Sequence, residues 1–184
     1  IVLSDGTKED KTYTSVFDGA TNGFDSQFDA LKLDNDIFDL STYDSEGSRL
    51  AINFFPSFNC EKVVGLNIQD TDPGSYSLSF EKLDSFDPSY SFSLVDNFTA
   101  SATAVDLGTV YNFDVSSDEG SFNDRFELVI SRDAVDNELV VEGEELVCED
   151  NTTLVSLPSP QVGVGYQAVI NGNAFGDLII SDGL

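Results

Sequence analysis

Apolar and polar residues alternate along much of the chain, and the alternation is clearest between Ser91 and Ile130. Four alternating runs in this stretch are separated by turn-forming residues; they are Phe92–Leu94, Val105–Leu107, Val110–Val115 and Phe126–Ile130. Successive side chains of an extended strand point to opposite faces of a sheet, so a period of two leaves one face to be buried and the other to be hydrated. The stretch therefore predicts several strands of an antiparallel β-sandwich.

Further strands are expected before this stretch, with a turn signal between them roughly every ten residues. Arg49–Phe55, Val63–Gln69 and Tyr76–Phe80 alternate in the same way. The segment Asp70–Gly74 separates the last two and is a strong turn signal, because its proline presets φ and its glycine tolerates positive φ. Regular spacing of short strands and turns is typical of an antiparallel sandwich.

The first half of the chain also holds less regular segments. Lys11–Phe17 alternates and predicts a strand, and the acidic segment Asp34–Ser48 predicts a short strand inside loops. In Gly23–Leu33, the rings of Phe24 and Phe28 lie four residues apart. This spacing fits one or two turns of helix as well as an irregular loop packed on the sheet.

The alternation weakens at Ser131–Asn137, and we place a domain boundary there. Residues 1–133 form the predicted β-sandwich domain, of jelly-roll or immunoglobulin-like type, and residues 138–184 form a second, immunoglobulin-like β unit. Its short strands are expected at Leu139–Val141, Leu146–Val147, Thr153–Leu157, Tyr166–Ile170 and Leu178–Ile180. Because an immunoglobulin-like sandwich needs about seven strands over about 100 residues, we expect this unit to be partial and to continue beyond the end of the chain. The predicted fold class is all-β.

The charge of the chain argues against two kinds of partner. It holds 8 Lys and Arg against 34 Asp and Glu, which gives a formal net charge of −26. A surface this negative repels phosphate backbones and anionic lipids, so we expect no nucleic-acid partner. No apolar run approaches the roughly 20 residues of a membrane-spanning helix, so we also expect no membrane insertion.

The residue types of the chain argue against an enzyme. It contains no His, which excludes within the chain the Ser–His–Asp and Cys–His forms of nucleophilic catalysis. Two cysteines without histidine do not supply the usual zinc ligands, and no phosphate-binding glycine motif is present. Acidic residues occur everywhere, so paired carboxylates for glycoside hydrolysis carry no specific signal. We expect no catalytic residues.

Calcium is the one metal that the sequence favours. Asp18, Asp25 and Asp29 fall in one turn-rich segment, and hard cations prefer carboxylate and backbone oxygens in such turns. The alternative is that Asp18 and Asp25 accept hydrogen bonds from backbone N–H groups and so stabilise the turns. Because no EF-hand spacing is present, we favour the turn contacts over calcium. No other cofactor is expected.

Carbohydrate binding is a second candidate activity, because sandwich lectins present exposed aromatic rings. Tyr43, Tyr90 and Tyr166 lie near predicted loops and are the candidate ligand-binding residues. The phenylalanines lie mostly on predicted strands, where packing in the core explains them better.

Arg125 and the two cysteines each lead to a further expectation. Arg125 is one of the few basic residues, and we expect it to form an ion pair or to bind carbonyl groups of the turn after Gly120. Cys60 and Cys148 are too few for a disulfide scaffold, and the sequence leaves open whether they pair, stay free or bind partners elsewhere.

A set of short motifs in the first 131 residues resembles a β-sandwich module of secreted and surface proteins of Bacteroidota, the cargo of the type IX secretion pathway. The motifs follow one another in the same order, at Gly19–Thr21, Gly23–Asp25, Phe28–Leu33, Leu50–Asn53, Gly74–Leu78, Leu94–Asn97, Tyr111–Phe113 and Asn123–Phe126. The second unit is similar to the front half of an immunoglobulin-like module from such proteins, on the cues Val147–Asp150, Thr153–Val155, Ser159–Ala168 and Asn171–Gly172.

The resemblance implies a non-catalytic structural or adhesive module of a large protein exported by type IX secretion. Such a protein is located outside the cell or on its surface, as an adhesin or gliding-motility protein, and its partners are its own other domains and secretion or cell-surface proteins. The alternative is a carbohydrate- or protein-binding sandwich that accompanies a secreted enzyme, with glycans among its partners.

Overall fold

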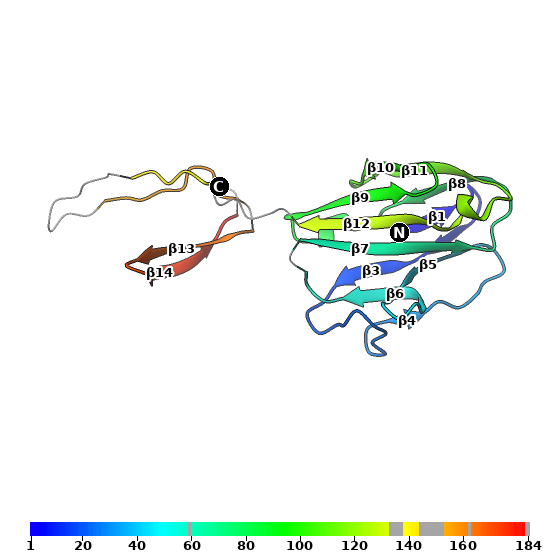
Figure 1. Cartoon of the computed structure of the whole chain (residues 1–184), viewed down its shortest axis with the longest axis horizontal. Coiled ribbons are helices and arrows are strands. Elements are labelled where there is room, and N and C mark those ends of the chain that lie inside the picture. Colours follow the sequence, from blue (N-terminus) through cyan, green and yellow to red (C-terminus); the bar gives the residue numbers. More distant parts are fainter. Residues whose placement is uncertain (59, 133–137, 144–152, 162, 183–184) are drawn as a thin grey trace. The chain divides into compact units, whose positions relative to one another are not determined.

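The computed structural model describes residues 1–58, 60–132, 138–143, 153–161 and 163–182 (Figure 1). The chain divides into two compact units. The first comprises Ile1–Phe86 and Tyr90–Arg132, and the second comprises Asp87–Ser89 and Asp133–Leu184.

The first unit is built almost wholly of strands. They are β1 (Val2–Ser4), β2 (Glu9–Lys11), β3 (Tyr13–Val16), β4 (Ala30–Leu31), β5 (Asp39–Tyr43), β6 (Arg49–Phe55), β7 (Glu61–Gln69), β8 (Gly74–Ser79), β9 (Tyr90–Asp96), β10 (Ser101–Ala104), β11 (Val110–Val115) and β12 (Asn123–Arg132). Two single turns of 3₁₀ helix, η1 (Leu83–Ser85) and η2 (Glu119–Ser121), lie between strands. Across the described part of the chain, no helix has the length and apolar character needed to cross a membrane.

The strands of the first unit form two sheets. The smaller has the order β11-β8-β1-β2, and the larger has the order β10-β9-β12-β7-β5-β6-β3, with β4 also paired to β6. Figure 1 shows β9, β12 and β7 of the larger sheet side by side. Among the described residues of this unit, the paired strands are antiparallel except β3 with β6, which are parallel. The predicted all-β, antiparallel, sandwich-like fold class is confirmed.

The core lies between the two sheets. Alternate residues of β7 and β12 face it. On β7 these are Val64, Leu66 and Ile68, which lie opposite residues of β8 such as Leu78. Fully burying one such aliphatic side chain contributes about 1.5–3 kcal/mol, so these alternating positions provide most of the force that holds the sheets together. The apolar residues that recur at every second position of the sequence are the residues of this inner face.

The predicted strands agree with the structure where one face is buried. Arg49–Phe55 has the bounds of β6, and Val63–Gln69 lies within β7. The expected strand at Val105–Leu107 is wrong: β10 ends at Ala104, and a turn with Gly108 at φ +87° follows. Val105 is buried in the core while Leu107 is exposed. The two apolar residues on either side of Asp106 therefore matched the alternation of a strand without forming one.

For Gly23–Leu33, the structure supports the loop and not the helix. The segment contains turns and the two-residue strand β4. The ring of Phe28 packs against that of Phe17, with 4.7 Å between centroids, and against that of Phe54. The four-residue spacing of Phe24 and Phe28 therefore belongs to a loop that packs on the sheet.

The second unit contains a β-hairpin of β13 (Gly165–Ile170) and β14 (Asn173–Ile180). Asn171 and Gly172 join the strands with φ of 51° and 80°, the positive values that a tight hairpin turn requires. The predicted strands Leu139–Val141 and Thr153–Leu157 are wrong, because within the described ranges these segments pair only through an isolated bridge between Glu142 and Ser156. The prediction at Leu146–Val147 lies outside the described residues.

Candidate functional site

A buried ion pair joins the two sheets at β11. The Arg125 guanidinium on β12 donates to Asp96 on β9 through Nε–Oδ1 at 2.8 Å and Nη2–Oδ2 at 2.6 Å. Its Nη1 donates to the carbonyls of Ser121, at 2.9 Å, and of Asp114 on β11, at 3.0 Å. The hydroxyl of Tyr111, also on β11, donates to Asp96 Oδ2 at 2.8 Å. We call Asp96, Tyr111 and Arg125 the β11 clamp.

The β11 clamp keeps Asp96 ionised. Burial raises the pKa of this carboxyl, but hydrogen bonds from Arg125, Tyr111 and Thr99 lower it by more, and the net result is a pKa well below its usual range. The Arg125 guanidinium also lies about 5 Å from three ring centroids, those of Phe98, Phe113 and Phe126, at 4.9, 5.1 and 4.8 Å. These contacts offset part of the cost of burying its charge. Arg125 therefore forms both the ion pair and the carbonyl contacts that its sequence position suggested.

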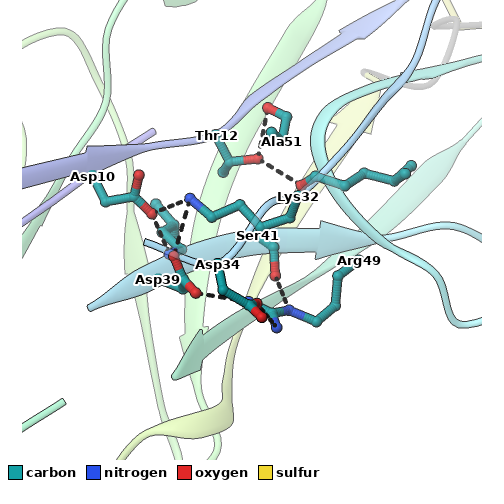
Figure 2. A network of polar contacts seen from close by, with 10 residues as sticks. Asp10, Thr12, Lys32, Asp34, Asp39, Ser41, Arg49 and Ala51 are labelled. Atoms are coloured by element: carbon teal, nitrogen blue, oxygen red, sulfur yellow. Dashed lines mark hydrogen bonds and ion pairs between the residues drawn. The ribbon is translucent and has the colours of Figure 1, made fainter. Parts of the chain in front are cut away.

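A second polar network joins the sheets at β2 (Figure 2). The Lys32 ammonium, after β4, contacts Asp10 on β2 and lies 3.6 Å from Asp39 on β5. Asp10 also accepts a hydrogen bond of 2.5 Å from the backbone N–H of Leu40 on β5. Arg49 on β6 pairs with the other oxygen of Asp39 at 3.3 Å. We call Asp10, Lys32, Asp39 and Arg49 the β2 clamp.

The two clamps occupy equivalent positions in the smaller sheet. Strands β11 and β2 are its two outermost strands, and each is tied to the larger sheet by charged side chains that solvent scarcely reaches. Their donors and acceptors are directed at protein groups, which suits them to fix the two sheets in one relative register.

A pocket of about 360 Å³ opens on the first unit where β5 ends. Its walls come from the end of β5, the turn after it, β6 and the start of β7, and Asn22 adds a side chain from an earlier loop. The polar residues in its lining are Asn22, Tyr43, Asp44, Ser45, Asn53 and Lys62. We call it the Tyr43 pocket. Its volume lies within the range of about 300–1,000 Å³ typical of small-molecule sites.

A smaller cavity of about 230 Å³ is mostly apolar. Aromatic rings, among them Phe54, Phe80, Phe86 and Phe92, form much of its lining. The hydroxyl oxygen of Thr14, which also lines it, is buried and has no hydrogen-bond partner in the described part of the chain. Polar groups are what orient a ligand, and they form the larger part of the lining surface in the Tyr43 pocket but the smaller part in this cavity, so the Tyr43 pocket is the stronger candidate binding site.

The three aspartates expected to hold calcium do not form a cluster. Asp29 accepts hydrogen bonds of 2.7 Å from the backbone N–H groups of Phe54 and Asp25, and Asp25 accepts one of 2.5 Å from Thr21. Asp18 is exposed. No group of three or more His, Cys, Asp or Glu suited to a metal occurs among the described residues. Asp25 thus makes a turn contact of the kind that the alternative interpretation expects, and Asp29 makes two backbone contacts of the same kind.

The three candidate tyrosines lie in different surroundings. Tyr43 is half-buried in the pocket, where burial and the neighbouring Asp124 raise the pKa of its hydroxyl. Tyr90 packs its ring among Phe58, Phe86 and Arg132. Tyr166, on the hairpin of the second unit, accepts a hydrogen bond from the backbone N–H of Gln161 at 2.8 Å. Of the three, Tyr43 is the one placed to contact a ligand in the Tyr43 pocket.

Several site residues were not among those singled out from the sequence. Asp44 and Lys62 of the pocket, and Asp10, Lys32 and Asp39 of the β2 clamp, look like ordinary surface charges in a chain with so many acids. Their burial arises from contacts between distant segments, which alternation does not reveal. Cys60 is exposed and free, and Cys148 lies outside the described residues.

Comparison with known proteins gives one match. A family model described as a domain of unknown function, DUF8693, matches residues 2–130, which is well over half of the chain. Neither a curated protein nor a solved structure matches the chain.

Proposed function

The chain belongs to the DUF8693 family of domains of unknown function, and we propose that it serves as a non-catalytic structural module of a secreted or cell-surface protein. The two clamps carry this proposal. They tie both outermost strands of the smaller sheet to the larger one, so the sheets part only if several charged groups lose their partners together. A module that holds other domains apart outside the cell needs this resistance to opening.

The charge distribution supports a place outside the cell. Surface ion pairs weaken as salt rises, because mobile ions screen exposed charges, whereas buried pairs are screened much less. The side chains of Arg125 and Asp96 are 4% and 1% exposed, and those of Lys32 and Asp39 are 5% and 0% exposed. The clamps therefore keep their strength over a wide range of ionic conditions. The type IX secretion route remains an expectation of the sequence resemblance.

Pulling on single molecules of the full chain, held by handles at both ends, tests the structural role. We expect the first unit to resist extension and then unfold in one step, at a force that falls when Lys32→Met or Arg125→Met removes the cation of a clamp. Lys8→Met, in an exposed turn, is the matched control and leaves the force unchanged. Gradual extension without a distinct step, or equal forces in all variants, would contradict the proposal.

The alternative role, a carbohydrate- or protein-binding module, is favoured by one observation. The Tyr43 pocket combines an aromatic ring with acidic, basic and amide side chains. A structural module with such a pocket could also attach to carbohydrates or proteins on a surface by binding them in the pocket.

A further inference from the structure

The Tyr43 pocket contains a buried acceptor without a partner. Asp44 is 8% exposed, and its Oδ1 accepts backbone N–H bonds from Glu46 at 2.9 Å and Ser48 at 2.7 Å. Its Oδ2 is buried and has no hydrogen-bond partner among the described residues. A buried acceptor left without a donor costs about 1–3 kcal/mol, and more when it is charged, so this oxygen favours a ligand that donates a hydrogen bond.

The same pocket contains a donor with spare capacity. Lys62 donates one hydrogen bond, from Nζ to the Asn22 side-chain oxygen at 2.7 Å, and an ammonium group has three donors. Its ammonium also lies 5.1 Å from the Phe55 ring centroid. Among the described ion pairs, none joins Lys62 to a carboxylate. Lys62 therefore favours a ligand group that accepts a hydrogen bond.

An aromatic ring and a glycine complete the pocket. The Tyr43 side chain lies beside Gly65 of β7, where an added Cβ would approach the ring at 3.8 Å. Because Gly65 carries no side chain, the sheet surface next to the ring stays low. A ring bordered by a low surface can pack against a flat, partly apolar ligand.

These groups together restrict the ligand. Asp44 only accepts hydrogen bonds and Lys62 only donates them, so the ligand has to do both within a small space. The chain charge of −26 repels anionic ligands, and the Lys62 ammonium in the pocket repels cationic ones, which leaves neutral ones. Sugars fit all three conditions, because each hydroxyl both donates and accepts and the C–H face of the ring packs on aromatic side chains. We propose that the Tyr43 pocket binds a neutral saccharide, with Tyr43 against its ring and with Asp44 and Lys62 on its hydroxyl groups.

Binding of the full chain to an array of neutral and acidic oligosaccharides tests this proposal, followed by calorimetric titration with the neutral oligosaccharide that binds best. We expect neutral glycans to bind. We expect Tyr43→Ala and Asp44→Asn each to weaken the affinity by about tenfold or more, since a hydrogen bond to a charged group has that weight. Asp44→Asn keeps an oxygen for the backbone bonds at Oδ1 but replaces the free acceptor with a donor, so it tests the ligand contact without removing the turn.

Tyr13→Ala is the matched control, because Tyr13 is 50% exposed on β3 and does not line the Tyr43 pocket. It leaves the affinity unchanged. Absence of binding to any glycan, binding to acidic glycans alone, or equal affinity in all variants would overturn the proposal. Melting curves of the variants identify any that are unfolded. These readouts are independent of the clamps, so failure here leaves the structural role untouched.

Discussion

Arg125 and Asp96 are 29 residues apart in sequence and form a pair of parallel hydrogen bonds inside the first unit, at 2.8 and 2.6 Å. Both belong to the larger sheet, yet two further contacts of the pair reach β11 of the smaller sheet, through the carbonyl of Asp114 and the hydroxyl of Tyr111. The planar guanidinium allows this arrangement, since its donors point in fixed directions toward several acceptors at once. One side chain thus links three strands.

Replacement of Arg125 tests how much of the linkage depends on this geometry. We expect Arg125→Met to lower the free energy of unfolding by about 3–5 kcal/mol, because it leaves the Asp96 carboxylate buried without its cation. Arg125→Lys keeps the charge but not the paired geometry, and we expect it to lose about 2 kcal/mol. Urea unfolding at pH 7 measures both. Arg132→Lys, at an exposed position, is the control; a loss as large there would show that Arg125 has no special role.

Acid should weaken the β11 clamp. The pKa of Asp96 is lowered in the folded chain, so its stabilisation is complete above the unfolded value of about 3.9 and is lost as the pH falls below it. Asp96→Asn cannot titrate at this position. We therefore expect the wild type to be more stable than Asp96→Asn by about 3–5 kcal/mol at pH 7, with the gap narrowing as the pH falls from about 4 toward 2.

Unfolding free energies measured between pH 7 and pH 2 check this dependence. Asp34→Asn is the control, because the Asp34 side chain is 80% exposed and we expect a gap of less than about 1 kcal/mol at every pH. A gap between the wild type and Asp96→Asn that stays constant over this range would show that the ionisation of Asp96 does not contribute to folding.

The β2 clamp predicts a similar loss in the free energy of unfolding when a different cation, the Lys32 ammonium, is removed. Lys32→Met leaves the side chains of Asp10 and Asp39 close together without the ammonium between them, and we expect a loss of about 3–5 kcal/mol in the free energy of unfolding. Replacing Asp39 by Asn in the same chain removes one of these charges and should restore part of the loss. Chemical denaturation of the two variants and of Lys8→Met, the exposed control, measures the effect. Equal stability of Lys32→Met and Lys8→Met would contradict it.

Sequence patterns predicted the strands better than they predicted the sites, and the reason is physical. A period of two appears wherever one sheet face is buried, which is why β6 was located to the residue. Ion-pair partners carry no such period: among 34 acidic residues, nothing local marks Asp96 as the partner of Arg125. Tyr43 was singled out, with Tyr90 and Tyr166, because it lies near a predicted loop. Asp44 beside it was missed, because its burial depends on residues from β6 and β7.

The calcium hypothesis leads to the last prediction. Asp29 is 9% exposed and its two carboxylate oxygens accept backbone bonds from Phe54 and Asp25 at 2.7 Å. Each oxygen already faces the positive end of an N–H dipole, which repels a cation, so calcium at this carboxylate would weaken these two bonds, each worth about 1.5–3 kcal/mol. We therefore expect neither a chelator nor added calcium chloride to change the melting temperature of the wild type.

Asp29→Ala separates a turn contact from a metal ligand. Removal of the carboxylate leaves both N–H groups without their acceptor, so we expect a loss of about 2–3 kcal/mol in the free energy of unfolding, equal with and without calcium. Ser26→Ala, at an exposed position of the same segment, is the control and should cost little. If calcium instead raises the melting temperature of the wild type but not of Asp29→Ala, the carboxylate binds the ion, and the backbone bonds belong only to the calcium-free form.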